Sequence, residues 1–339
     1  MRARIEALEQ QVEEAKSQRE KVNALNTLAW ALVKTDPERA TKISADAGRI
    51  SHEGDFSKQP YIEGTAASLC NIAHVYLYQS DYDKAITTSF EIVNMVEGLP
   101  PSITLSRTYN CIAACYRILG SMADALDYYF KQIQVSQEIQ DKETYANGLV
   151  GIGSIYHDTG RHESALEYFR ESLPVFEEMG ESYWEALVLN NISYMHHCLS
   201  HHERALERGL QSLEKAQRHG HRRIEILASG TIGEVYDLMG QDEQARHYFQ
   251  TAVSLAREIS YRDQEIDGLR LLAKFYISRS QPDEAINALN QCLRLAESLN
   301  HRHFLFQCHE LLYQAYKIKG DMEAALTHHE QFYAIRESV

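Results

Sequence analysis

The chain of 339 residues has too little basic charge for a protein that binds polyanions. Its 34 Lys and Arg are outnumbered by 48 Asp and Glu, which gives a net charge of −14. DNA, RNA and anionic membrane surfaces all attract proteins through a basic footprint. The composition therefore predicts no nucleic-acid partner and no membrane partner.

Long apolar segments are also missing. No run of 18 apolar residues occurs anywhere, so no membrane-spanning helix is expected. The N-terminal segment MRARIEALEQQVEEAKSQREK is charged throughout and lacks the apolar core of a secretory signal. The sequence therefore predicts a cytoplasmic protein.

The cysteines are few, and their spacing is not typical of a metal site or of a disulfide-stabilised fold. The chain has no CxxC pair, and its six cysteines are Cys70, Cys111, Cys115, Cys198, Cys292 and Cys308. Dispersed cysteines in a cytosolic protein are most simply reduced thiols.

What the chain does contain is a repeat of 40 residues. Aromatic residues, with one histidine among them, recur at this spacing: Tyr76, Tyr116, Tyr156, His196, Tyr236, Tyr276 and Tyr316. Nine residues after each stands an alanine: Ala85, Ala125, Ala165, Ala205, Ala245, Ala285 and Ala325. Seven units in unbroken register identify a repeat protein.

Each unit predicts two helices joined by a tight turn. A small residue follows the aromatic position by four: Ser80, Gly120, Gly160, Ser200, Gly240, Ser280 and Gly320. Such residues end a helix in a left-handed turn. An acidic residue follows in six of the seven units, where the free N–H groups of a second helix favour negative charge. The alanine then predicts a close crossing of the two helices.

The N-terminal part follows the same pattern less regularly. Residues 21–56 predict a degenerate first repeat. Its alanine, Ala40, precedes the alanine of the next repeat, Ala85, by 45 residues instead of 40. Residues 1–20 carry an amphipathic face and predict a helix that either caps the array or forms a coiled-coil contact. We favour the cap. The predicted organisation is completed by seven repeats of 40-residue period over residues 62–339.

The residue order within each unit resembles the tetratricopeptide repeat, whose usual period is about 34 residues. One of the two best matching units is formed by Gly153, Tyr156, Gly160, Ala165 and Phe169. The resemblance implies an all-α, right-handed superhelical solenoid of about eight antiparallel helix hairpins. The longer period is similar to that of the sensory and regulatory arrays of bacterial signalling proteins.

Stacked hairpins form a concave surface that is lined mainly by the first helix of each repeat. Asn110, Asn147 and Asn190 lie there, and their amides can both donate to and accept from a peptide backbone. Arg107 and Arg117 make one end basic, whereas later repeats are acidic, an order that would orient a ligand of mixed charge. The alternative is that all these side chains are ordinary solvated groups. The predicted groove residues are Arg107, Asn110, Arg117, Asn147, His157, Asn190, Tyr194, His197, Glu234, Asp237, Asp267, Arg270 and Lys274.

No residue pattern predicts catalysis or a cofactor. His196, His197, His201 and His202 lie near Cys198, but in a helix hairpin these side chains point in different directions. We therefore expect neither a metal site there nor an enzyme.

The most consistent function is a scaffold that binds a peptide or protein segment as the regulatory module of a bacterial signalling system. Two alternatives remain: a structural adaptor or chaperone-like assembly factor without switching, and a peptide-responsive enzyme regulator. The last hairpin would leave Leu326, Phe332 and Ile335 uncovered. We therefore expect a second copy, a partner or a downstream output domain to cover that end.

Overall fold

The computed structural model describes residues 2–299 and 301–337, and within these ranges it contains α-helices and one short 3₁₀ turn. No helix in the described ranges is long and apolar enough to cross a membrane. An N-terminal helix, α1 (Arg2–Glu14), precedes eight consecutive helix pairs in this part of the chain. The predicted all-α stack of about eight antiparallel hairpins is confirmed.

The first helices of the pairs are α2 (Gln18–Leu32), α4 (Ile62–Tyr78), α6 (Ile103–Ile118), α8 (Lys142–Asp158), α10 (Ser182–Cys198), α12 (Arg222–Leu238), α14 (Arg262–Ser278) and α16 (Arg302–Lys319). The second helices are α3 (Pro37–Ile50), α5 (Tyr82–Met95), α7 (Met122–Glu138), α9 (His162–Met179), α11 (His202–His219), α13 (Asp242–Glu258), α15 (Pro282–Ser298) and α17 (Met322–Glu337). The extra residues between α3 and α4 include the 3₁₀ turn η1 (Gly54–Phe56).

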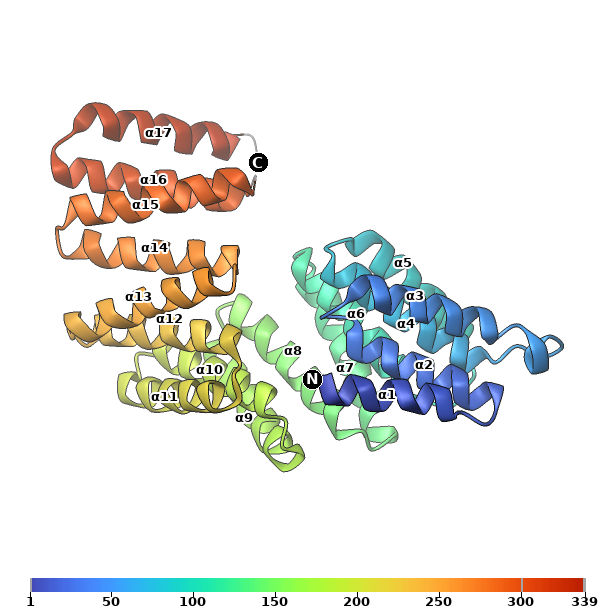
Figure 1. Cartoon of the computed structure of the whole chain (residues 1–339). Helices are drawn as coiled ribbons and strands as arrows, with labels where there is room; N and C mark the ends of the chain where they lie inside the picture. Colours follow the sequence, from blue (N-terminus) through green and yellow to red (C-terminus); the bar gives the residue numbers. More distant parts are fainter. Residues whose placement is uncertain (1, 300, 338–339) are drawn as a thin grey trace. The chain divides into compact units, whose positions relative to one another are not determined.

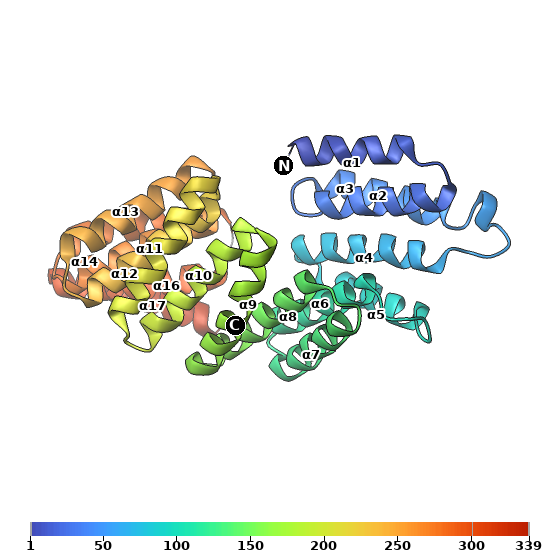
Figure 2. The same ribbon diagram turned by 90° about the horizontal axis from the view of Figure 1, so that it is seen from below.

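The chain divides into two compact units, residues 1–175 and 176–339. In the first unit, α2, α4, α6 and α8 contact one another in sequence, and α1 packs on α2 (Figure 2). In the second unit, α10, α12, α14 and α16 form a corresponding row, and α13 and α15 each pack between consecutive members of it (Figure 1). The first helices thus form a continuous layer within each unit.

A left-handed turn ends each first helix from α4 to α16. The predicted turn residues all have positive φ, from 53° at Ser280 to 85° at Gly320. The next N–H closes the turn on the carbonyl of the aromatic position, as Ser121 does on Tyr116 at 2.9 Å. The connections between hairpins use the same conformation at Gln140, Gly180, Gly220 and Ser260.

The repeated alanines lie where the two helices of a hairpin cross. Six of them are completely buried, and Ala325 is 2% exposed. Close approach is also visible at Gly153 of α8, where an added β-carbon would lie 2.8 Å from the ring of Phe169. The absence of larger side chains at these positions therefore sets the distance between paired helices.

The ends of the array differ in how they are covered. In α1, Ile5, Leu8 and Val12 pack against the apolar cluster of α2. The assignment of residues 1–20 as a cap nevertheless stays a prediction. In α17, Leu326 is 58% exposed as expected, whereas Phe332 and Ile335 are half-buried. Phe332 stacks on Phe306 with ring centroids 4.4 Å apart.

Replacing Ala245 by leucine should force α12 and α13 apart. Ala245 is fully buried, and overpacking such a site costs about 1–3 kcal/mol. Urea unfolding of the whole chain should show this loss in the free energy of unfolding. Gln244→Leu is the control, because the neighbouring Gln244 is exposed. Equal effects of the two substitutions would contradict the close crossing at the alanine.

Candidate functional site

Every predicted groove residue lies on a first helix, from α6 to α14. Five of them belong to the first unit. The second-unit groove, as we name it, consists of the other eight, together with the part of α16 beside them: Asn190, Tyr194, His197, Glu234, Asp237, Asp267, Arg270 and Lys274. Because the two units are separate bodies, each set is described by itself.

Glu234 is the central charged group of the second-unit groove. Burial raises the pKa of its carboxyl to about 7. Arg270 and Lys274 oppose this effect because their positive charges favour the carboxylate, whereas Asp237 and Asp267 reinforce it. These five side chains therefore interact electrostatically across α12 and α14.

The neighbouring carboxylates are already engaged. Asp267 accepts a hydrogen bond from Arg270 Nη2 at 3.2 Å, and Asp237 pairs with Arg279 at 2.7 Å. The Nε of Arg270 is buried and has no hydrogen-bond partner in the described structure. Arg270 thus keeps one donor available beside Glu234.

Two polar groups, one on α10 and one on α14, lie on either side of a glycine of α12 at the same repeat position. Asn190 of α10 and Arg270 of α14 occupy equivalent repeat positions, and Gly230 of α12 takes the place between them. A β-carbon added at Gly230 would meet only a methyl of Leu271, at 3.7 Å. Asn190 is 6% exposed, and its Oδ1 lacks a hydrogen-bond partner within the described ranges. Asn190 thus carries an unsatisfied acceptor on α10 and Arg270 an unsatisfied donor on α14 within the described structure.

Tyr194 and His197 complete the α10 wall, with ring centroids 5.5 Å apart. Burial, followed by the nearby Glu234 carboxylate, raises the pKa of Tyr194 to about 12. Burial lowers the pKa of His197, and His202 lowers it further. Both side chains are therefore neutral at physiological pH.

A cavity of about 350 Å³ extends the second-unit groove between α14 and α16. Of its lining residues, only Lys274 was predicted from the sequence, and those of α16 were not. The signal that identifies them is the 40-residue period, which places Glu310 after Arg270 and Gln314 after Lys274. The lining residues are Lys274, Ile277, Ser278, Glu310, Leu311 and Gln314.

In the first unit, Arg107 packs on an aromatic group that the sequence analysis missed. Its guanidinium lies 4.0 Å from the centroid of the Trp30 ring, and Trp30 meets His74 edge-on at 4.8 Å. Burial lowers the pKa of His74 to about 4, so the imidazole is neutral. Arg107 is therefore held by an aromatic platform across α2, α4 and α6.

The other predicted residues of the first unit are only partly available to a ligand. Arg117 forms a 2.7 Å ion pair with Asp158, so it supplies less free positive charge than expected. Asn110 donates to Gln132 at 3.1 Å. Asn147 Oδ1 is buried without a hydrogen-bond partner in the described structure, and burial lowers the pKa of His157.

The histidine-rich hairpin forms contacts between imidazoles. His196 is 2% exposed, and its Nδ1 lies 3.3 Å from the Nδ1 of His201. Among the described residues, no group of three or more His, Cys, Asp and Glu is placed to hold a metal ion.

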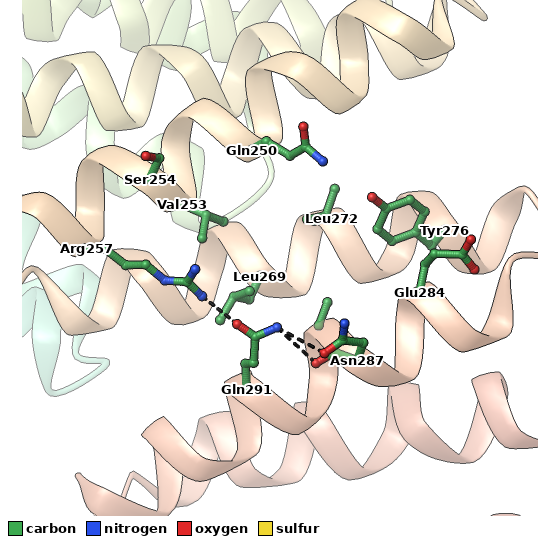
Figure 3. Close-up of a pocket in the computed structure, with 11 residues that line it drawn as sticks. Gln250, Val253, Ser254, Arg257, Leu269, Leu272, Tyr276, Glu284, Asn287 and Gln291 are labelled. Atoms are coloured by element: carbon green, nitrogen blue, oxygen red, sulfur yellow. Dashed lines mark hydrogen bonds between the residues drawn. The ribbon is translucent and has the colours of Figure 1, made fainter.

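A different groove lies on the side of the second helices, between α13 and α15 with α14 as its floor (Figure 3). Its volume is also about 350 Å³, and none of the predicted residues lines it. At its rim, Arg257 donates to Gln291 at 2.7 Å and to Glu265 at 2.5 Å. Arg257 and Gln291 at this rim are thus already hydrogen-bonded within the protein.

Comparison with known proteins places these features in a family. The profile of the tetratricopeptide repeat matches residues 104–178, 145–218 and 224–298. Together these segments cover more than half of the chain. A search of the curated proteins found no match.

Several solved structures share the fold at low sequence identity. The apo quorum sensor NprR from B. thuringiensis has a TM-score of 0.72 and 12% identity, with 98% of this chain and 92% of that chain covered. A Rap protein complexed with competence and sporulation factor has a TM-score of 0.68 and 14% identity, with coverages of 94% and 98%.

A signal-transduction ATPase (STAND) protein with a tetratricopeptide repeat sensor, from Pyrococcus horikoshii, has a TM-score of 0.69 and 16% identity. The alignment covers 97% of this chain and 51% of that one, so this chain spans about half its length. At these identities the likenesses show a common fold.

The raised pKa of Glu234 predicts a pH-dependent stability. The pKa of Glu234 is about 7 in the folded chain and 4.5 ordinarily. The stabilisation that protonated Glu234 gives the folded state is therefore complete below pH 4.5 and is lost as the pH rises through 7. Thermal unfolding from about pH 5 to about pH 8 should reveal a loss of about 1–3 kcal/mol that Glu234→Gln removes. Glu297→Gln, at an exposed position of α15, should leave the wild-type profile unchanged. If both variants follow the wild type, Glu234 is not the responsible group.

Proposed function

The chain belongs to the tetratricopeptide repeat family, and we propose that it binds an extended peptide segment along the second-unit groove. The observation that supports this most strongly is the buried carboxyl of Glu234 beside Arg270 and Lys274. Because burial makes the charged form of this carboxyl costly, a cationic ligand group that pairs with it gains affinity.

The arrangement specifies the chemistry of the peptide. A lysine or arginine side chain, or an N-terminal amine, fits opposite Glu234 because it stabilises the carboxylate form. A carboxylate of the same peptide fits near Arg270 and Lys274, where a donor remains unused. The free acceptor of Asn190 suits a backbone N–H of the peptide. We therefore infer a mixed-charge peptide as the ligand.

We further propose a regulatory role in bacterial signalling. The support is the common fold with a quorum sensor and with a Rap protein that was solved with competence and sporulation factor. Because consecutive repeats contact each other directly, a ligand that spans α10 to α16 can alter the spacing of several hairpins together. The proposed activity is binding without catalysis.

Selection from a random peptide library with the whole chain tests the binding proposal. Selected peptides should carry a basic residue, and Asn190→Ala and Glu234→Gln should each weaken binding about tenfold, measured by calorimetry. The matched control is Gln291→Ala in the groove between α13 and α15 (Figure 3). Loss of binding in this control alone would move the site to the other face.

Binding of a basic peptide should release protons. A cation beside Glu234 lowers its pKa from about 7, so about half a proton per chain should leave near neutral pH. Calorimetry in two buffers of different ionisation enthalpy measures this number. Glu234→Gln should abolish the release, and proton uptake by the wild type would contradict the assigned contact.

A further inference from the structure

Two cysteines on neighbouring helices of the second unit face each other within the core. Cys292 lies on α15 and Cys308 on α16, and their Sγ atoms are 2.7 Å apart. This is closer than the roughly 3.5–4.0 Å preferred by non-bonded heavy atoms. It exceeds the length of a disulfide, about 2.0 Å, so a small displacement brings the sulfurs to bonding distance.

The surroundings of this pair hold both thiols in place. Both side chains are completely buried, and the cluster around them includes Leu289 of α15 and Leu312 of α16. The thiol of Cys292 also contacts the carbonyl oxygen of Ile266 at 3.8 Å. The two helices therefore present the sulfurs to each other from opposite sides of one packed interface.

The other close cysteine pair provides a comparison within the same chain. Cys111 and Cys115 lie one turn apart on α6 and are also buried. Residues at this spacing keep their β-carbons about 5–6 Å apart on a helix, whereas a disulfide needs about 3.5–4.5 Å. The rigid helix disfavours a bond there, and no such constraint separates Cys292 from Cys308.

We propose that Cys292 and Cys308 are a redox modification site, at which a peroxide converts the two thiols into a disulfide that joins α15 to α16. This inference is independent of the proposed peptide binding. The composition predicts that the two thiols are reduced, and the proposal adds that a peroxide can oxidise them to a disulfide. The bond would close the chain between residues 292 and 308 around the turn that leads into α16.

The chemistry proceeds in two balanced steps. The first sulfur, as thiolate, attacks a peroxide oxygen, so an S–O bond forms, the O–O bond breaks and hydroxide leaves. The second sulfur then attacks the resulting sulfenic acid, so the S–S bond forms, the S–O bond breaks and the oxygen leaves as water. Overall the thiols lose two electrons and two protons, and hydrogen peroxide is reduced to two molecules of water.

Burial limits the reactivity of both thiols. The hydrogen bond to the Cys308 sulfur, followed by burial, raises the pKa of the Cys292 thiol. Because both sulfurs are buried, the reaction needs a transient opening of the last hairpins and should be slower than oxidation of the partly exposed Cys198.

Hydrogen peroxide treatment of the fully reduced whole chain tests the proposal. After the remaining thiols are alkylated and the chain is digested, mass spectrometry should find one peptide pair linked through Cys292 and Cys308. The melting temperature should rise by at least about 3 °C because the closed segment restricts the unfolded chain. Dithiothreitol should reverse both changes.

Two variants and one internal control complete the test. Cys308→Ala should abolish the link and the temperature shift, whereas Cys111→Ala should keep both. Mapping the wild-type chain needs neither variant, so it decides the question even if Cys308→Ala folds poorly. Oxidation of Cys198 shows that the peroxide has acted. If Cys292 and Cys308 then remain free thiols, or are oxidised without becoming linked, the proposal is wrong.

Discussion

The hydrogen bond that closes each left-handed turn is the interaction on which the rest of the structure depends. It runs from the residue after the turn to the carbonyl of the aromatic position, as from Gln281 to Tyr276 at 2.9 Å. Because it ends each first helix at the same repeat position, the second helix always begins in the same register. The alanine then always reaches the crossing, and successive first helices align side chains that are 40 residues apart.

That alignment explains the chemistry of the second-unit groove. Tyr194, Glu234 and Lys274 occupy equivalent positions on α10, α12 and α14. The Glu234 carboxyl therefore interacts electrostatically with Tyr194 of α10 and with Lys274 of α14. The raised pKa of Glu234 is thus a consequence of the repeat, since burial is its largest cause. The repeat that builds the fold thus also buries a carboxyl whose charged form is costly.

The sequence was sufficient to predict the hairpins because their signals are local. Glycine or serine marks the turns from Ser80 to Gly320, and small residues mark the crossings. The turns at Gln140 and Ser260 were not predicted, because they connect successive hairpins and lie outside the repeat positions that carry the predicted glycine or serine. Trp30 was missed as the partner of Arg107 because the first repeat is offset by 45 residues instead of 40.

The predicted groove residues lie on first helices, and their role in binding stays a prediction. Spacing identifies the side of the helix on which a residue lies, but hydrogen-bond partners and depth depend on neighbouring helices. Asn110 is engaged by Gln132, which comes from the second helix α7. The Cys292–Cys308 contact joins a second helix to the next first helix, a relation that the repeat of aromatic residues does not describe.

The most direct test of the central claim is to map where a selected peptide lies on the chain. A peptide that carries a photo-crosslinking residue can be irradiated in complex with the whole protein, and the modified residues can be identified by mass spectrometry. We predict crosslinks on α10, α12, α14 and α16, on the side of Tyr194 and Glu234. Crosslinks confined to α13 and α15 would contradict the account.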